Sequence, residues 1–519
     1  MSATIEQKIS QARRWIQNIP VSNEEYVSAR KWAEEKICAA CVAAGLNQWV
    51  EEYINNQANP DDGISNIIFQ ADGIVSPELL APLANRITDS EQKTHALFTL
   101  GYRFCQKGNL NQTKELYTQG EALQDARKCD ARELALSGRK WFDDLGDNQA
   151  ARKSMERAIT LIERDGVPHN KALDESILAG EYVYCGFPEE GKRWFAQALS
   201  RRDELESSAD KDHLVFCLYD QYCDCGWIEQ AEQTLRLIEN PTVLQEQWGE
   251  EEYAVTNYYQ PLVDALEEKQ EWDKAIAYIQ KESDISNRNV MLTSLCNAMI
   301  NADSFNLARS LARRTDLGFA DFSSGCIELE IANRQIEIQD FSNAEETINQ
   351  FYYNELLPKT EQALSRSDIQ TSQELPRITE QLYYSAKAYL DCQNLQRAAS
   401  VLIAYERILI AMESSFDNMN ILLEDWGRVA LLWKRLIEYR YPSAETFALI
   451  AENKAFEIYA VQPESKNCWT DSLISIETLA QLNEQRALNA AAAKNDGFAA
   501  VRVLIQNIYK NMPAGVSIK

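Results

Sequence analysis

Side chains that could carry acid–base chemistry are few in this 519-residue chain. The three histidines are His95, His169 and His213, and none of them lies within a metal-ligand or catalytic-triad pattern. Their spacing therefore favours solvated histidines near helix starts, with a ligand role as the alternative interpretation.

Cysteines offer a second kind of chemistry. Cys38 and Cys41 form a CxxC pair, which in other contexts is a redox motif or half of a zinc site. A redox pair of this kind usually follows a strand, whereas this pair lies within a helical pattern that opens near Ser22. No second CxxC exists, and Cys223 and Cys225 are far away along the chain. We interpret Cys38 and Cys41 as helix-packing residues, and the scattered cysteines predict a cytoplasmic chain with reduced thiols.

Phosphate-binding and hydrolytic motifs are missing from the sequence, including GxGxxG, GxxxxGK[ST], GxSxG and HExxH. We therefore expect no enzymatic activity, no cofactor and no metal site. The net charge of −27 argues against non-specific binding to nucleic acid or to anionic membranes. Isolated arginine pairs such as Arg13-Arg14 are not interleaved with stacking aromatic residues. No stretch is apolar and long enough to insert into a membrane.

The elements that must position the remaining polar residues follow one repeated pattern. An apolar-periodic helix ends at a break, and a second helix follows it. The breaks are Gly108, Gly146, Gly186, Gly226, Gln270, Asp303, Gln339 and Gln393. Five residues after each break stands an anchor: Thr113, Ala151, Gly191, Ala231, Ala275, Ala308, Ala344 and Ala398. A small anchor lets the two helices approach closely, and the apolar residue one turn later lies on the same face.

This pattern resembles the tetratricopeptide repeat (TPR) family, whose unit is a helix–turn–helix of about 34 residues. The first clear unit carries Leu97, Leu100, Gly101, Phe104, Gly108, Thr113 and Tyr117 at the family's positions. The resemblance covers roughly residues 90–410, and several repeat spacings are longer than the family's. It implies an all-α fold: a right-handed α-solenoid of stacked helix–turn–helix repeats with helical end caps.

In this family the first helix of each unit lines a concave groove, so the resemblance implies a partner-binding surface there. The transferred positions are His95, Phe98, Tyr102, Arg139, Asp143, Ser176, His213, Phe216, Asp220, Asp224, Asn257, Gln260, Asp264, Glu267, Asn297, Asn333, Tyr383 and Lys387. The Lys/Asn/Lys/Arg set with which family members clamp an acidic chaperone tail is absent.

Acidic residues recur near the end of the first helices, seven residues before the anchors. They are Asp144, Asp224, Glu268, Glu337 and Asp391. A carboxylate at a helix C-terminus opposes the macrodipole at a cost of roughly 0.3–1 kcal/mol, so local helix stability does not explain the recurrence. Two interpretations stay open: solvation of the turns, or a negative lane for a basic or amide-rich peptide.

The array leaves two ends to be covered. A chain of this length exceeds a single core, and we divide it into an N-terminal helical region with degenerate repeats (1–90), the repeat array (91–410) and a C-terminal helical bundle (411–519). The bundle is expected to close the apolar end of the array, with Trp426 and Trp433 on one helix face. Asn59-Pro60-Asp61-Asp62-Gly63 is a strong turn signal, and Leu357–Glu374 is expected to be a long loop or an extended helix.

These features favour a non-enzymatic protein–protein interaction scaffold or adaptor that binds a peptide or protein segment in the groove. The alternative is a ligand- or peptide-responsive regulator whose solenoid closes on its ligand. The expected partner is a protein or peptide, with a basic segment if the negative lane is used.

Overall fold

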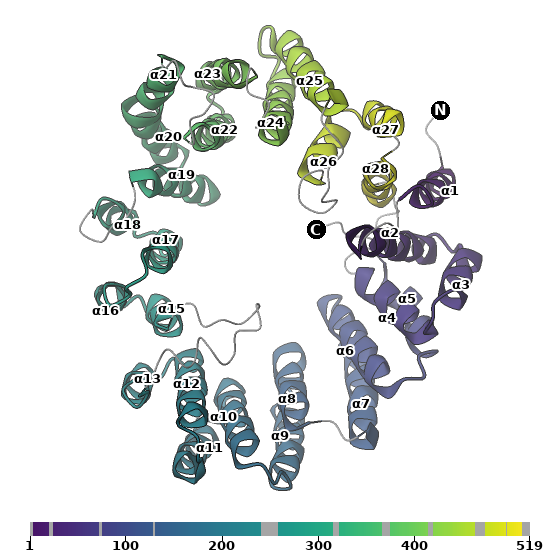
Figure 1. Cartoon of the computed structure of the whole chain (residues 1–519), viewed down its shortest axis with the longest axis vertical. Coiled ribbons are helices and arrows are strands. Elements are labelled where there is room, and N and C mark those ends of the chain that lie inside the picture. The colour runs from purple at the N-terminus through teal and green to yellow at the C-terminus, as the bar shows by residue number, and fades with distance from the viewer. Residues whose placement is uncertain are drawn as a thin grey trace. The chain divides into compact units, whose positions relative to one another are not determined.

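The computed structural model describes residues 4–19, 24–71, 75–127, 130–239, 258–314, 321–365, 374–413, 419–461, 473–494 and 496–510. Every regular element in these ranges is a helix (Figure 1). The prediction of an all-α solenoid built from stacked helix pairs is confirmed. The chain divides into two compact units, each described separately below.

Residues Asp89–Ile327 form the central unit, which is a run of helix pairs. Within each pair the second helix packs on the first, and each first helix also contacts the first helix of the next pair. The pairs are α6 (Ser90–Gln106) and α7 (Leu110–Arg127), α8 (Ala131–Leu145) and α9 (Asn148–Ile162), α10 (Pro168–Tyr184) and α11 (Pro188–Ser200), α12 (Ser208–Asp224) and α13 (Ile228–Leu235), α15 (Gln260–Glu268) and α16 (Trp272–Ile279), and α17 (Ile285–Asn301) and α18 (Phe305–Ala312). A 3-10 turn, Arg201–Glu204, follows α11.

Residues Met1–Thr88 and Glu328–Lys519 form the terminal unit, and the division between the two units falls inside α19 (Asp321–Glu337). Its N-terminal helices are α1 (Ile5–Ile16), α2 (Glu24–Ala43), α3 (Asn47–Asn55), α4 (Pro60–Gln70) and α5 (Pro77–Ala84). Its later helices are α20 (Phe341–Phe351), a π-helical turn (Tyr352–Leu356), α21 (Leu357–Ser365), α22 (Leu375–Asp391), α23 (Leu395–Met412), α24 (Met419–Glu438), α25 (Ala444–Val461), α26 (Leu473–Leu482), α27 (Glu484–Ala493) and α28 (Gly497–Lys510).

The predicted breaks are real helix ends in all eight pairs. Each break residue has a positive φ, from 56° at Asp303 to 82° at Gly186. In most pairs the following N–H donates to the carbonyl five residues back, as Phe187 N does to Tyr182 O at 2.8 Å. This Schellman-type bond satisfies a carbonyl that the helix end would otherwise leave open. It also accounts for Gln270 and Gln393, which hold a left-handed conformation without being glycine.

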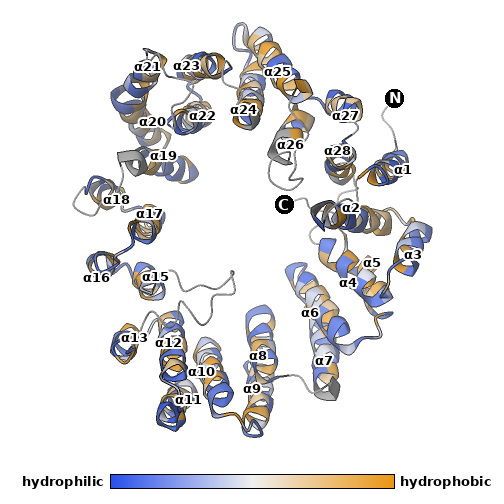
Figure 2. Cartoon of the chain, viewed as in Figure 1, coloured by the Kyte–Doolittle hydropathy of each residue, from blue (hydrophilic) through white to orange (hydrophobic). Residues whose placement is uncertain are grey.

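The predicted anchors are all buried, because the second helix approaches the first most closely there. At Gly191 a Cβ atom would lie 2.9 Å from the Ala179 carbonyl oxygen, so that crossing has no room for a side chain. Thr113 is the exception in size, and its hydroxyl donates to the Gly101 carbonyl at 3.0 Å. The apolar faces that meet at these crossings alternate with polar faces along the helices (Figure 2).

The first and last helices of the chain pack on each other within the terminal unit (Figure 1). The Trp32 ring of α2 meets Phe498 of α28 edge to face, with centroids 6.0 Å apart. Lys8 of α1 forms an ion pair with Glu484 of α27 at 3.4 Å. Gly497 abuts the α1 backbone so closely that a Cβ would lie 2.7 Å from the Trp15 carbonyl oxygen. The apolar faces of the two chain ends therefore cover one another.

The turn expected at residues 59–63 needs correction. Asn59-Pro60 does not form a free turn, because Asn59 caps α4 by accepting from Asp61 N and Pro60 takes the first helical position. The first part of the expected linker is the helix α21, while residues 366–373 lie outside the described ranges. Trp426 and Trp433 are both fully buried. The three-part division of the chain remains a prediction.

Candidate functional site

Seven carboxylates gather on the first helices of four consecutive pairs in the central unit. We call this set the acidic strip: Asp143 (α8), Glu181 (α10), Asp220 and Asp224 (α12), and Asp264, Glu267 and Glu268 (α15). The helices are neighbours, since α8 contacts α10, α10 contacts α12 and α12 contacts α15.

Helix α15, which carries three members of the acidic strip, is fixed to α12 by a buried tyrosine. The Tyr219 hydroxyl accepts a hydrogen bond from Leu262 N at 3.1 Å, which satisfies an N–H group in the first turn of α15. The same hydroxyl lies 3.3 Å from the Tyr258 carbonyl oxygen, to which it donates. The position of α15 next to Asp220 and Asp224 is therefore determined by the core rather than by the carboxylates.

Burial and neighbouring carboxylates raise the pKa values of several members of the acidic strip. Burial, with Asp224 and Asp264 nearby, raises the pKa of Asp220 to about 6. Burial and Asp264 raise the pKa of Glu267 to about 7. The pKa of Asp224 is also raised by burial, against the opposite effect of Arg139, and Glu268 and Asp264 add to the rise. Burial is the largest cause of each of these shifts, and the neighbouring carboxylates add to it.

One cation serves the N-terminal end of the acidic strip. Arg139 Nη1 lies 3.6 Å from Glu181 Oε1, and Arg139 Nε lies 3.5 Å from Asp143 Oδ2. The guanidinium carbon stands 3.8 Å from the centre of the Tyr184 ring. Even so, burial raises the pKa of Glu181 to about 7 against the opposite effect of Arg139. In the described part of the chain, no cation lies within ion-pair distance of Asp220, Asp224, Asp264, Glu267 or Glu268.

Two oxygens of the acidic strip are buried without a hydrogen-bond partner, Glu181 Oε2 and Glu267 Oε1. Glu181 is only 7% exposed, and its other oxygen faces Arg139. Glu267 Oε2 accepts from the Ser294 hydroxyl of α17 at 3.1 Å. Buried carboxylate oxygens are normally hydrogen-bonded, and leaving one without a donor costs about 1–3 kcal/mol. A hydrogen-bond donor that reached either oxygen would satisfy it.

Of the residues predicted from the TPR resemblance, the structure brings five together in the acidic strip: Asp143, Asp220, Asp224, Asp264 and Glu267. Arg139 and Gln260 join them, the latter by donating to Asp264 Oδ1 at 2.5 Å. Glu181 was missing from the transferred set. It lies one helical turn before Cys185. Only the tertiary structure shows that it faces Arg139.

The other predicted positions fall elsewhere. Phe98 and Ser176 are buried in the core and present no surface to a partner. Tyr102 is exposed on α6 and Asn297 is exposed on α17, whereas Phe216 is half-buried beside Tyr219. Asn333, Tyr383 and Lys387 are half-buried in the terminal unit, where Arg428 lies over the Tyr383 ring. Asn257 lies outside the described residues.

Two of the histidines pair with each other rather than with solvent alone. His169 Nε2 of α10 and His213 Nδ1 of α12 are 3.2 Å apart, and His213 Nε2 is 3.4 Å from Cys217 Sγ. Burial, with His169 second, lowers the pKa of His213 to about 4, so its ring is neutral at pH 7. His95, at the equivalent repeat position, is exposed. The shared sequence position therefore does not produce a shared environment.

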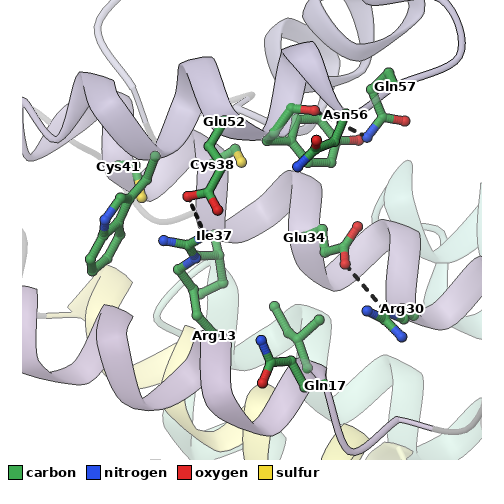
Figure 3. A pocket seen from close by; sticks show the side chains of 13 residues that line it. Arg13, Gln17, Arg30, Glu34, Ile37, Cys38, Cys41, Glu52, Asn56 and Gln57 are labelled. Carbon is green, nitrogen blue, oxygen red and sulfur yellow. Dashed lines mark hydrogen bonds and ion pairs between the residues drawn. The ribbon is translucent and has the colours of Figure 1, made fainter.

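The CxxC cysteines line a pocket of about 340 Å³ between α1, α2 and α3 (Figure 3). Its mouth carries two ion pairs, Arg13 with Glu52 at 2.8 Å and Arg30 with Glu34 at 3.2 Å. Burial raises the pKa of Cys41 to about 12, and burial together with Cys41 raises that of Cys38 further. A thiol held in its protonated form is a poor nucleophile and a poor metal ligand, which supports the packing interpretation.

No family model and no curated protein matches the chain. Solved structures with a similar helical arrangement include Ton1535 from Thermococcus onnurineus NA1, at 12% identity and a TM-score of 0.28, covering 70% of this chain and 98% of that one. Another is a STAND protein with a tetratricopeptide repeat sensor, PH0952 from Pyrococcus horikoshii, at 12% identity and a TM-score of 0.25, covering 87% of this chain and 72% of that one.

A circular tandem repeat protein is also similar, at 13% identity and a TM-score of 0.17, covering 92% of this chain and 97% of that one. The stacked helix pairs of its own structure make this chain a helical repeat protein. Likenesses at such low TM-scores say nothing of function, and the acidic strip is the feature of the structure that points to one. None of the described helices is long and apolar enough to span a membrane.

Proposed function

We propose that this protein is a non-enzymatic, TPR-like interaction scaffold that binds a basic segment of a partner protein along the acidic strip. The observation that carries the proposal is the unmatched charge: seven carboxylates on four adjacent first helices, with Arg139 as their only ion-pair partner among the described residues. Two of their oxygens are buried and lack a donor.

Arginine and lysine side chains fit this arrangement on physical grounds. A guanidinium presents several N–H donors in a plane and bonds carboxylates bidentately, and an ammonium supplies three donors on a flexible stem. Burial is the main reason that the pKa values of Asp220, Asp224 and Asp264 are raised, and a cation placed near them would relieve the repulsion between carboxylates that adds to it. Binding would then proceed faster at low salt, because the exposed part of the attraction is screened within about 10 Å at 0.1 M ionic strength.

A direct test uses a short labelled peptide of Arg, Gly and Ser and its counterpart with Glu in place of Arg. Fluorescence anisotropy at low salt is expected to show binding of the first peptide and none of the second. The triple variant Asp220→Lys/Asp224→Lys/Asp264→Lys should weaken binding at least about 100-fold, because like charges then face each other.

The matched control places the same charge change on second helices of the same unit: Glu156→Lys/Glu229→Lys/Asp273→Lys. These three carboxylates are exposed on α9, α13 and α16. The control variant should lose less than about tenfold in affinity for the peptide, which is the loss expected from the change in net charge alone. Equal losses in the two triple variants, with both folded by circular dichroism, would contradict a role for the acidic strip. So would equal binding of the two peptides by the unmodified chain.

A further inference from the structure

We propose that Glu91, His95 and Glu133 form a binding site for a divalent first-row transition metal ion, with Zn²⁺ as the type case. One ligand atom from each of the three side chains can be chosen such that all three atoms lie within 4.8 Å of one another. This site is separate from the acidic strip and is independent of the proposed peptide binding.

The helix geometry of α6 supplies two of the ligands. Glu91 and His95 are four residues apart on α6, so they stand on one face, one turn from each other. Two ligands at this spacing chelate an ion from a single rigid element. The pair is visible in the sequence as Glu-x-x-x-His, but by itself it holds only two positions around a metal.

The third ligand comes from the neighbouring repeat. Glu133 lies in the first turn of α8, and α6 contacts α8 within the central unit. Its backbone is fixed by the Asp130 cap, whose side chain accepts from Glu133 N at 2.7 Å. A metal held by all three side chains would therefore join the first two helix pairs of the central unit.

The donor set identifies the class of ion. One imidazole nitrogen with two carboxylate oxygens suits Zn²⁺ and related ions, whereas an all-oxygen set would suit Ca²⁺ or Mg²⁺. Zinc ligands bond at about 2.0–2.2 Å, so two of them on one ion lie no more than about 4.4 Å apart. Glu91 and His95 are exposed and Glu133 is half-buried, so the side chains are able to close the remaining few tenths of an ångström. Three protein ligands leave a coordination position open to water.

The other histidines do not form such a set. His169 Nε2 and His213 Nδ1 are as close as two zinc ligands, but the second nitrogen of His213 faces Cys217. Among the described residues, Glu91, His95 and Glu133 are the group of three or more potential ligands whose atoms converge.

The experiment titrates the full chain, kept reduced, with Co²⁺ alone and with Zn²⁺ alone. Co²⁺ absorption separates nitrogen and oxygen ligands, which give only weak visible bands, from thiolates, which add an intense near-ultraviolet charge-transfer band. Calorimetry with Zn²⁺ gives stoichiometry and affinity. The variants are His95→Ala and Glu133→Gln, with Glu156→Gln as a control that removes an exposed carboxylate of α9 from the same unit.

The proposal expects one equivalent of Co²⁺ bound without a thiolate band, and a melting temperature that rises with Zn²⁺. Each ligand variant should weaken Zn²⁺ binding at least about tenfold and lose the rise, while Glu156→Gln keeps both. No binding by the unmodified chain, a thiolate band, or equal affinity in His95→Ala would overturn it. His95 is exposed and glutamine keeps the size of Glu133, so both variants are expected to fold, and their unchanged melting temperature without metal verifies this.

Discussion

Asp224 and Asp391 occupy the same repeat position, at the ends of α12 and α22, yet the structure treats them differently. In the terminal unit, Arg435 of the next first helix lies 2.8 Å from Asp391, and Glu337 pairs with Arg334 of its own helix at 3.3 Å. In the central unit, the next first helix brings Asp264 and Glu268 to Asp224, and burial together with these two carboxylates raises the pKa of Asp224 against the effect of Arg139. Whether the charge at this repeat position is neutralised therefore depends on which side chains the next first helix places beside it.

This difference divides the recurrent acids into two classes. Asp144 accepts from the Tyr117 hydroxyl, and Glu337 and Asp391 have arginine partners, so turn solvation and ion pairing account for these three. Asp224 and Glu268 belong to the acidic strip, where the peptide-binding interpretation is proposed. Of the two interpretations left open by the sequence, the first accounts for Asp144, Glu337 and Asp391, and the second stays a proposal for Asp224 and Glu268.

The largest expected effect tests the general rule that a buried carboxylate needs its partner. Glu175 of α10 is fully buried, with Arg201 Nε at 2.6 Å and Gln197 Nε2 at 2.7 Å. Arg201→Met should destabilise the protein by about 3–5 kcal/mol, because a buried charge is left without its cation. Denaturant unfolding measures the loss. Adding Glu175→Gln should recover part of it, and a loss below about 1 kcal/mol for Arg201→Met would break the rule.

The next prediction concerns pH and the acidic strip. Glu181 and Glu267 have pKa values of about 7 and Asp220 of about 6, so they gain protons as the pH falls from 8 to 5.5. The strip loses negative charge over this range, and binding of the Arg-containing peptide should weaken by at least about tenfold. His213, with a pKa of about 4, stays neutral and does not contribute. Anisotropy titrations across the range give the profile, and a flat profile would rule out these carboxylates as the binding groups.

Glu267→Gln tests the state of the unpaired carboxylates through the free energy of unfolding. Because the folded pKa of about 7 exceeds the unfolded value, the unfolded chain ionises first as the pH rises, and stability falls between roughly pH 4.5 and 7. Glutamine removes this penalty and keeps the acceptor for Ser294. We expect a gain of about 1 kcal/mol at pH 8, after allowing for solvent screening of a half-buried group, and no gain at pH 4. Thermal unfolding at the two pH values measures it, and an equal gain at both would contradict this origin.

The smallest expected effect concerns Asp391, the carboxylate that has an arginine partner. Arg435→Ala removes the partner of Asp391 in a partly exposed ion pair and should cost about 0.5–1 kcal/mol at low salt, less at high salt. The double-mutant cycle with Asp391→Asn isolates the pair energy. A stabilising effect of Arg435→Ala would mean that the terminal unit tolerates unpaired acids as the central unit does, and the contrast between them would disappear.

Much of the fold was predictable because it depends on short-range patterns. Each break combines a left-handed residue with a Schellman bond inside a few residues, and each anchor is small because a neighbouring helix crosses there. Helix boundaries were predicted wrongly where one sequence signal is compatible with two local structures. Asn-Pro begins a turn or caps a helix, and at Asn59 the hydrogen bond to Asp61 N made it a cap. Asn483 caps α27 in the same way, by accepting a hydrogen bond from Arg486 N.

The candidate site was only partly predictable, because a repeat position specifies a helix face and not what stands opposite it. Asp220, Asp224 and Asp264 were identified from their position, but Glu181 became part of the strip only through its contact with Arg139. Phe98 and Ser176 share the helix face in the sequence pattern and are nevertheless buried. Glu133 joins Glu91 and His95 through packing between α6 and α8.

The amino-acid sequence by itself determined the helix pairs, their breaks and their buried anchors, since these depend on conformational preference and side-chain size within one or two turns. The tertiary structure alone decided which carboxylates have a cation within reach. It also decided that α28 packs on α1 and α2, because the apolar faces at the two chain ends are compatible with many partners. Charge pairing and end-to-end packing depend on distances between residues far apart in the chain, and no local pattern records those distances.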